Sequence, residues 1–265
     1  LMVLVAHFPV PAPRTVKLAP PRGALEMADV WVTPPGSQTA VVAGVSLVLQ
    51  PGQALAIVGP SAAGKSSLAK TLLGIWRPLR GDLRIDGATY DQWDSEDLGS
   101  AIGYVAQQVE LAEGTVAENI ARFDPQATSA LVIAAAQAAG LHEMILGLPN
   151  GYETMLSSAS FELSAGQRQR LGLARALYRD PHLVVLDEAN SNLDAAGDEA
   201  LARAIEGVKA RGGIVVMITH RPATLGPVTH IAIMQAGRIV DLDVRDKVLA
   251  RLQGRPPQAA VVQPT

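Results

Sequence analysis

The chain of 265 residues has no cysteine, which excludes disulfides, thiolate zinc sites and cysteine nucleophiles and is compatible with a reducing compartment. It also has no excess of basic charge. The formal net charge is -3, so no basic stripe is present to release counterions from a phosphate backbone, and no nucleic-acid partner is expected. Long apolar runs are missing too. The opening LMVLV is far shorter than the roughly 20 residues that span a bilayer, so we expect the chain to be soluble when isolated.

Apolar residues make up 48% of the chain, which is enough for a sizeable core. The segment FPVPAPRTVKLAPPR near the start is rich in proline, which removes backbone donors and favours an extended tether. The last residues are rich in proline, glutamine and alanine and are expected to fray. We therefore predict a linker at 1–24, a globular domain at 25–252 with a helical subdomain at about 110–178, and a flexible tail at 253–265.

The order of apolar runs predicts an α/β fold. LEMADVWV and VSLVLQ are typical of antiparallel strands, and ALAIV, which ends at Gly59, is typical of a central buried strand. Later runs are LVVL (183–186), GIVVMI (213–218) and HIAIM (230–234), and a helical pattern covers about 195–210. This alternation predicts a mainly parallel sheet, an N-terminal antiparallel β part and a helical insert.

The segment GPSAAGKS, between the strand ALAIV and a helical pattern, predicts a phosphate-binding loop. Glycines let the backbone wrap round a phosphate chain, and the helix start offers free N–H groups to the anion. Lys65 is expected at the β- and γ-phosphates and Ser66 at Mg²⁺. An ordinary glycine turn is the alternative, and the flanking strand and helix argue against it. The expected nucleotide-binding residues are Gly59, Pro60, Ser61, Ala62, Ala63, Gly64, Lys65, Ser66 and Ser67.

LVVLDE places two carboxylates at the end of a buried strand, where ligands gather on parallel sheets. Asp187 is suited to hold Mg²⁺, and Glu188 to polarise the attacking water as a general base. Two solvated acids are the alternative interpretation, and the phosphate loop elsewhere in the chain weakens it. The absence of an NKxD segment that reads guanine favours ATP over GTP.

LSAGQRQR precedes a helical pattern, so the Ser164 hydroxyl is suited to cap that helix. The small residues Ala165 and Gly166 also permit the close approach of a phosphate, and Arg168, Arg170 and Arg175 add positive charge. Taken alone, the segment leaves both interpretations open. The order phosphate loop, LSAGQ, LVVLDE favours the nucleotide-binding one.

With these three segments in this order, residues 25 to 250 resemble the nucleotide-binding domain of the ABC transporter family, which has a P-loop NTPase core. The resemblance implies that Gln107 of YVAQ contacts Mg²⁺ or the attacking water, that Asp194 of SNLD lies between two copies, and that His220 contacts the γ-phosphate. A polar residue after a strand, a helix cap and a structural histidine are the respective alternatives. The resemblance also implies an ATP sandwich of two copies. In it, Ser164, Ala165, Gly166 and Gln167 of one copy would complete the site of the other.

The proline-rich entry, VTPPGSQ, LSAGQ and DEANSNLD make the chain most similar to bacterial type I secretion ATPases, which export proteases and lipases. This resemblance implies a membrane-spanning domain before the linker, a periplasmic adaptor and an outer-membrane channel. The implied location is the cytoplasmic face of the inner membrane. The alternatives are the energy subunit of another ABC transporter, a soluble ATPase acting on ribosomes or DNA, and a nucleotide sensor with little turnover. Intact Glu188 and His220 count against the sensor.

Two segments depart from the pattern of the family. The tyrosine that usually stacks on adenine is replaced near Pro34, and alternation along the strand directs Trp31 to the opposite face. The segment LSSASFE stands where exporters commonly have a Glu/Gly-rich stretch, so contact with the membrane domain is expected to differ.

Overall fold

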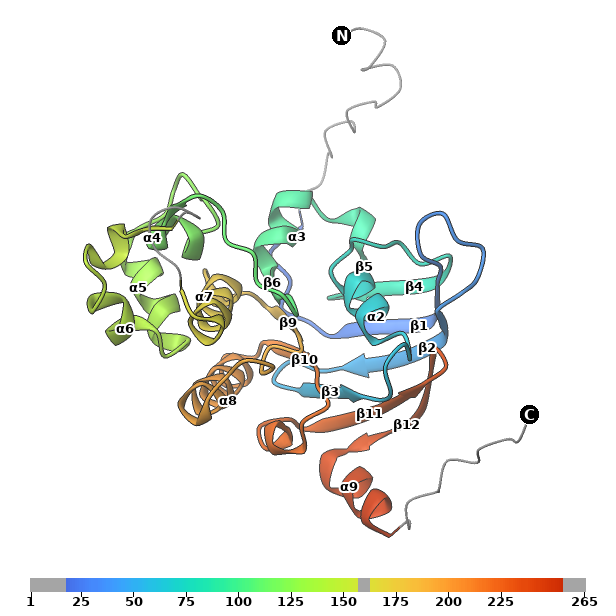
Figure 1. Cartoon of the computed structure of the whole chain (residues 1–265). Helices are drawn as coiled ribbons and strands as arrows, with labels where there is room; N and C mark the ends of the chain where they lie inside the picture. Colours follow the sequence, from blue (N-terminus) through green and yellow to red (C-terminus); the bar gives the residue numbers. More distant parts are fainter. Residues whose placement is uncertain (1–17, 157–162, 255–265) are drawn as a thin grey trace, which may run out of the picture.

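The computed structural model describes residues 18–156 and 163–254, so parts of the predicted linker, of LSSASFE and of the tail lie outside the described residues. The described chain is layered, with two larger sheets and helices against them (Figure 1). The larger sheet has the order β12-β11-β3-β10-β9-β6. Its strands are β3 (Ala54–Val58), β6 (Ile102–Val105), β9 (Leu183–Asp187), β10 (Ile214–Ile218), β11 (His230–Gln235) and β12 (Arg238–Val244).

All neighbours in this larger sheet are parallel except β11 and β12, which pair antiparallel. The predicted strand ALAIV is β3, which lies between β11 and β10. The runs LVVL, GIVVMI and HIAIM are β9, β10 and β11. The prediction of a mainly parallel sheet with ALAIV at its centre is therefore confirmed.

The second sheet is antiparallel and has the order β2-β1-β4-β5. It contains the two predicted N-terminal strands, now β1 and β2, and a β4–β5 hairpin that the sequence analysis did not predict. A two-residue pair, β7 with β8, forms a third small sheet inside the helical part. The bounds are β1 (Leu25–Val32), β2 (Val42–Leu49), β4 (Arg80–Ile85), β5 (Ala88–Thr89), β7 (Gly114–Thr115) and β8 (Met155–Leu156).

Two apolar cores lie on opposite faces of the larger sheet. Along β3, Leu55 and Ile57 pack toward the antiparallel sheet and α2 (Lys65–Leu72). Ala54 and Ala56 pack into the core shared with α7 (Ala165–Leu177) and α8 (Ala195–Ala210). Strands that are buried on both faces carry continuous apolar runs, because successive side chains point to opposite faces. This double burial is the reason why ALAIV and LVVL could be recognised from sequence.

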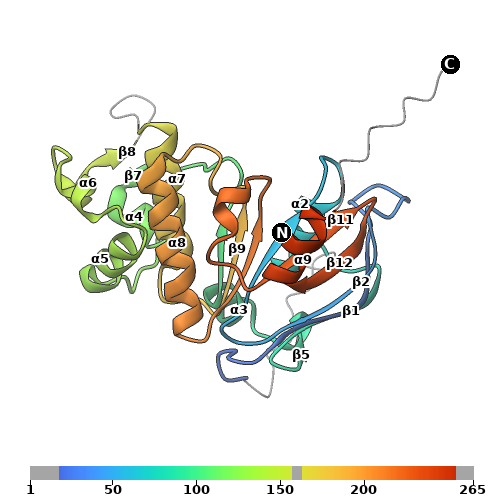
Figure 2. The same ribbon diagram turned by 90° about the horizontal axis from the view of Figure 1, so that it is seen from below.

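The helices cover these faces and form the lobe beside them, and α7 and α8 run side by side in Figure 2. The helical patterns predicted after the phosphate loop, after LSAGQ and at about 195–210 are confirmed as α2, α7 and α8. The α-helices are α2 (Lys65–Leu72), α3 (Ser95–Ala101), α4 (Val116–Ile120), α5 (Ser129–Ala138), α6 (His142–Leu146), α7 (Ala165–Leu177), α8 (Ala195–Ala210) and α9 (Arg245–Gln253). The 3-10 turns are η1 (Tyr90–Gln92), η2 (Gly151–Glu153) and η3 (Pro222–Leu225).

The segment TVAENIARF lies in the predicted helical subdomain, but only its first part is helical, because α4 ends at Ile120. Arg122 and Phe123 both have φ of 56°, a conformation that cannot continue a right-handed helix. The conformation directs the Arg122 guanidinium away from its own helix. Its nitrogens donate to four backbone carbonyls, at 2.9 Å to Arg175, and at 3.2 Å to Gly99, Ile102 and Ala176. Arg122 thus joins the helical lobe to α3, β6 and the C-terminal end of α7.

Replacement of Arg122 by alanine is expected to lower the free energy of unfolding by about 2–4 kcal/mol, since several carbonyls lose a charged donor. For a chain of this size that corresponds to a drop of several degrees in Tm, about 2–4 °C for each kcal/mol. Thermal unfolding monitored by circular dichroism measures the change.

Arg203→Ala is the matched control for this variant. Arg203 pairs with Glu199 at 2.6 Å, but both side chains are largely exposed, and exposed pairs contribute little. Equal Tm values for Arg122→Ala and Arg203→Ala would contradict the role of Arg122 as the joint of the lobe.

Candidate functional site

The ends of the parallel strands bring the predicted phosphate loop and the two carboxylates to one edge of the larger sheet. In the strand register, Ile57 pairs with Ile218 and Ile218 pairs with Asp187. The backbone continues this alignment, because the Thr219 N–H donates to the Ile57 carbonyl and the Glu188 N–H donates to the Ile218 carbonyl. Ligands of open α/β sheets bind at this edge.

The phosphate loop lies between β3 and α2 and needs its glycines. A Cβ on Gly59 would lie 2.1 Å from the Met234 carbonyl oxygen, and one on Gly64 would lie 2.4 Å from the Val41 carbonyl oxygen. Gly64 also has φ of 99°, which L side chains rarely adopt. The loop therefore forms a tight cradle that larger residues would disrupt.

Lys65 is the first residue of α2, and its side chain turns back over the cradle. The ammonium donates to the carbonyls of Gly59 at 2.9 Å and Pro60 at 2.8 Å, and the residue is 6% exposed. Within the described residues no side chain caps the start of α2. The first N–H groups of the helix are thus available to an anion beside a buried positive charge.

Asp187 ends β9 and lies next to the start of α2, where the Ser66 hydroxyl donates to its carboxylate at 3.4 Å. The residue is 5% exposed. Burial raises the pKa of Asp187, the Ser66 hydrogen bond opposes this rise, and the charge of Glu188 adds to it. The pair offers two oxygen ligands, which is the ligand type that Mg²⁺ prefers. The predicted metal residues Ser66 and Asp187 are therefore adjacent and fit a magnesium ion.

Three predicted catalytic side chains meet at Glu188. The Gln107 amide donates to one carboxylate oxygen at 2.8 Å, and the His220 Nε2 lies 2.6 Å from the other oxygen. Glu188 has φ of 52°, so the chain leaves β9 in a left-handed turn that directs this carboxylate differently from Asp187. Gln107 follows β6, and His220 follows β10. Three neighbouring strands of the sheet thus supply one cluster.

The LSAGQ segment forms a separate turn. Ser164 caps α7 through a reciprocal pair of bonds with Gln167, since the Gln167 N–H donates to the Ser164 hydroxyl at 3.2 Å and the Ser164 N–H donates to the Gln167 side chain at 2.9 Å. In the described parts of the chain, no hydrogen bond joins the Ser164 side chain to Lys65, Asp187 or Glu188. A Cβ on Gly166 would lie 2.9 Å from the Asn192 carbonyl oxygen. The predicted helix cap is present, and the Ser164 and Gln167 side chains are bonded within their own turn.

Arg175 does not add charge to this turn, contrary to the expectation. It lies near the other end of α7, where its guanidinium donates to the Glu110 carbonyl at 2.9 Å. A helix advances about 1.5 Å for each residue, so nine residues separate Arg175 from Gly166 by roughly 13 Å. Arg168 is closer, but it donates to the Leu163 carbonyl at 2.8 Å.

Asp194 caps α8 by accepting from the Gly197 N–H at 2.8 Å, as the cap interpretation of this residue predicts. Two further residues near the carboxylates were not predicted. Tyr104 lies close enough to Asp187 that, after burial, this charge raises the pKa of the phenol. Arg221 follows His220 and donates to the Asn190 carbonyl. In the sequence, the only signal for Tyr104 and Arg221 is that they lie close to the predicted residues Gln107 and His220.

Trp31 lies on the outer face of the antiparallel sheet. Its indole N–H donates to Asp29 at 2.8 Å, and the Arg238 guanidinium lies 5.5 Å from the ring centre. Val30 and Val32 on either side of it are buried. Trp31 thus faces away from those two side chains, as the alternation along the strand predicts.

Replacement of Asp187 by asparagine is expected to raise Tm at neutral pH by about 2–4 °C in the absence of nucleotide. Because the pKa of Asp187 is raised, the folded protein keeps a proton at pH values where the unfolded chain has released it, and stability falls as the pH rises through that window. Asparagine removes this loss. The gain should shrink as the pH is lowered toward about 4.

Differential scanning fluorimetry at neutral pH and at a pH of about 4 measures the gain in Tm under each condition. Asp82→Asn, in an exposed part of β4, is the control and should leave Tm within a degree or so of wild type. A lower Tm for Asp187→Asn at every pH would contradict the assignment of Asp187 as a carboxylate whose burial disfavours its charge.

Among residues 18–156 and 163–254, no helix is both long enough and apolar enough to cross a membrane.

Comparison with known proteins identifies the family. A sequence profile described as "ABC transporter" matches residues 42–191. The chain is 49% identical to the "Type I secretion system ATP-binding protein PrsD" of Rhizobium meliloti (strain 1021), over 89% of this chain and 41% of that protein. It is 36% identical to an "ATP-dependent lipid A-core flippase" of Alkalilimnicola ehrlichii, over 86% of this chain and 39% of that protein. The chain thus spans about two fifths of the length of these relatives.

The fold agrees with a solved structure as well. A bacterial Atm1-family ABC exporter with ATP bound superposes with a TM-score of 0.81 and 30% sequence identity, over 91% of this chain and 42% of the other. The family resemblance, the fold class and the expected ATPase class are confirmed. The chain belongs to the ABC transporter family and carries its ATPase domain.

Proposed function

We propose that this chain powers the export of a protein substrate across the bacterial inner membrane, as the ATPase part of a type I secretion exporter. The observation that carries the ATPase part is the convergence of Gln107 and His220 on Glu188 beside the Lys65 cradle. The type I secretion part is supported by the 49% identity to a relative of that name, against 36% to a lipid A-core flippase.

In the proposed reaction, Glu188 is the general base. A carboxylate can accept a proton from water within hydrogen-bond reach, and its own orientation then decides where that water lies. Gln107 and His220 hold its two oxygens at 2.8 and 2.6 Å. We infer that these contacts fix the carboxylate and that at least one of them lengthens when water and the γ-phosphate of ATP enter.

The phosphate chain of ATP would lie on the cradle of Gly59, Pro60, Ser61, Ala62, Ala63 and Gly64, with Ser67 one position beyond Ser66. Lys65 would exchange its two carbonyl contacts for phosphate oxygens, which are stronger acceptors because they are charged. Ser66, Asp187 and Gln107 would hold Mg²⁺, which when bound neutralises part of the phosphate charge. Burial raises the pKa of Asp187, and the nearby metal charge would lower it and favour the carboxylate form that binds the metal.

The separate LSAGQ turn supports a shared site. Ser164, Ala165, Gly166 and Gln167 start a 13-residue helix, and the Ser164 and Gln167 side chains are bonded within their own turn. We infer that this helix start binds the γ-phosphate of the ATP held by a second copy of the chain, since the N-terminus of a helix favours an anion. Asp194, at the start of α8, would lie in the same interface. Hydrolysis then requires the dimer.

The membrane-spanning partner would meet the helical lobe. A cavity of about 460 Å³ opens there between α4 and α5 and is lined by residues that include Phe123, Val132, Ile133 and Tyr152. Phe123 at this cavity is 47% exposed, and we infer that the membrane-spanning partner covers this apolar lining. In the proposed exporter the chain lies at the cytoplasmic face of the inner membrane. A periplasmic adaptor and an outer-membrane channel complete the path of the substrate.

A second candidate is the energy part of another ABC exporter, which the 36% identity to lipid A-core flippases supports. The proposed ATP chemistry would be the same in both cases. The substrate and the membrane-spanning partner would differ.

Replacement of Glu188 by glutamine is expected to lower kcat for ATP about 100-fold or more, because the amide cannot accept the proton of the attacking water. Glutamine keeps the shape of the side chain, so ATP binding should remain and the dimer should accumulate. Phosphate release measures turnover, and size-exclusion chromatography with light scattering in ATP and Mg²⁺ measures the dimer.

The matched control is Glu199→Gln, which changes an exposed acid on α8 that pairs with Arg203. It should hydrolyse ATP like the wild type and should not accumulate as a dimer. Unchanged turnover in Glu188→Gln would remove Glu188 from the role of base.

The proposed export role makes a prediction about the coding sequence upstream of Leu1. About six apolar spans of roughly 20 residues each are expected there, since that length crosses a bilayer. Reading the genomic sequence is the measurement. An upstream sequence with none of these spans would contradict the exporter assignment and leave the ATPase assignment intact.

A further inference from the structure

Arg221 joins two loops of the site that come from different strands. Its guanidinium NH1 donates to the Asn190 carbonyl at 2.7 Å, and the same nitrogen lies 3.8 Å from the Asp198 carboxylate on α8. Arg221 directly follows His220, and Asn190 lies two residues after Glu188. The arginine thus connects the loop after β10 to the loop after β9 at a second point, beyond the His220–Glu188 contact.

The Asn190 end of this contact is buried. Asn190 is 2% exposed, and its side-chain nitrogen has no hydrogen-bond partner in the described residues. Its carbonyl also accepts from the Leu193 N–H, but at a long 3.5 Å. Of the two hydrogen bonds to the Asn190 carbonyl, the one from Arg221 is therefore the shorter. It also comes from a charged donor, and such hydrogen bonds are stronger than those from neutral donors.

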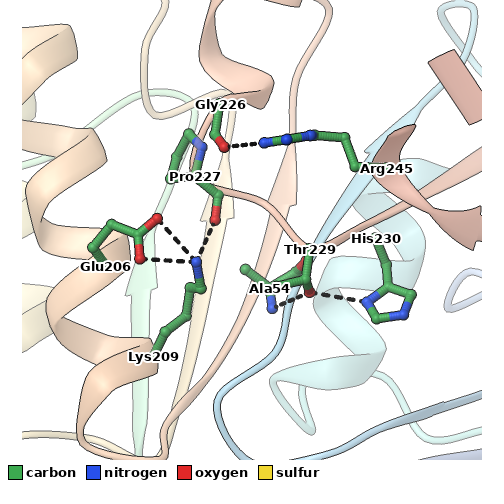
Figure 3. A network of polar contacts seen from close by, with 8 residues as sticks. All are labelled: Ala54, Glu206, Lys209, Gly226, Pro227, Thr229, His230 and Arg245. Atoms are coloured by element: carbon green, nitrogen blue, oxygen red, sulfur yellow. Dashed lines mark hydrogen bonds and ion pairs between the residues drawn. The ribbon is translucent and has the colours of Figure 1, made fainter. Parts of the chain in front are cut away.

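The Arg221 end belongs to a segment that is held along its length. The Arg221 N–H donates to the Thr219 hydroxyl at 3.1 Å, and the Thr224 hydroxyl donates to the Arg221 carbonyl at 2.8 Å. At the far end, Figure 3 shows Lys209 of α8 donating to the Pro227 carbonyl at 2.8 Å and the Arg245 guanidinium donating to the Gly226 carbonyl. The Arg221 backbone is thus bonded on both sides, to Thr219 and Thr224, within the loop that His220 begins.

The loop that Arg221 holds leads to the start of α7. Beyond Asn190, the Asn192 carbonyl oxygen lies 2.9 Å from the place of a Cβ on Gly166, so this loop touches the LSAGQ turn. Asp194 then caps α8 and ends the loop. A continuous set of contacts runs from His220 through Arg221 and Asn190 to Gly166.

We propose that Arg221 is a positioning residue that couples the two ATP sites of the dimer. The inference rests on the proposed function, in which His220 serves the site of its own copy and Gly166 the site of the other copy. ATP at His220 then fixes the position of the loop 189–194 through Arg221. That loop in turn positions the start of α7, which contacts the second ATP. In this proposal ATP at one site favours the binding of ATP at the other, and because coupling between two binding sites is reciprocal, the effect is the same in both directions.

The test measures ATP hydrolysis against ATP concentration for the whole chain and for Arg221→Ala. Wild type is expected to give a Hill coefficient above about 1, and the variant a value of about 1. The kcat of the variant is expected to fall about tenfold, since the loop after β10 and the loop after β9 lose the charged hydrogen bond that joins them. Arg221→Lys, which retains a charged donor, should restore part of the cooperativity.

Lys209→Met is the matched control. Lys209 holds the same segment at its far end, through Pro227, but no contact described for it reaches the Asn190 loop. This variant should lower Tm and keep both the Hill coefficient and kcat within about twofold of wild type. A merely structural role for Arg221 would make the two variants alike.

Three results overturn the inference. They are a wild-type Hill coefficient that is already about 1, an unchanged coefficient in Arg221→Ala at a Tm that shows a folded protein, and an equal loss of cooperativity in Lys209→Met. Failure of the proposed function is distinguishable, because Glu188→Gln would then form no dimer in ATP and Mg²⁺. If that dimer forms and the wild type is cooperative, only the role of Arg221 is in question.

Discussion

The parallel register of β3, β10 and β9 is the constraint on which the site depends. It sets Ile57, Ile218 and Asp187 side by side, so the phosphate loop, the loop with His220 and both carboxylates begin at one level of the sheet. The three strand ends themselves are far apart in the sequence. Parallel strands need long crossovers, and here the crossovers contain the helical lobe and α8. The motifs are thus far apart in the sequence because the chain between them forms the crossovers that bring their strands together.

The strands and motifs of the central part could be predicted because their signals are local. A strand that is buried on both faces must be apolar throughout, and a loop that wraps phosphate must contain glycine where a Cβ would strike a carbonyl. β12 was not predicted because only one face of its alternating sequence is even partly covered. The early end of α4 was also missed, since it depends on carbonyls of α3, β6 and α7 that the sequence does not place near Arg122.

In the candidate site too, the sequence indicates some residues by motifs but does not indicate how they contact one another. Glu188, His220 and Gln107 could each be indicated by a motif, but their common contact depends on strand order, which a motif does not contain. Arg221 carries no such indication, because its acceptor is a backbone carbonyl and any residue at position 190 would offer one. The expectation for Arg175 is wrong because the rise of the helix carries this arginine away from the helix start, although it belongs to the same helix.

The joint at Arg122 has a consequence for how such a domain can diversify. All four of its acceptors are main-chain carbonyls, so the attachment of the helical lobe depends on the path of the backbone and not on which side chains α3, β6 or α7 carry. Substitutions can therefore accumulate on both sides of the joint without loosening it, provided that the arginine and its backbone conformation remain. A lobe held in this way is free to change its outer surface to suit a new partner while the ATP-binding part keeps its geometry.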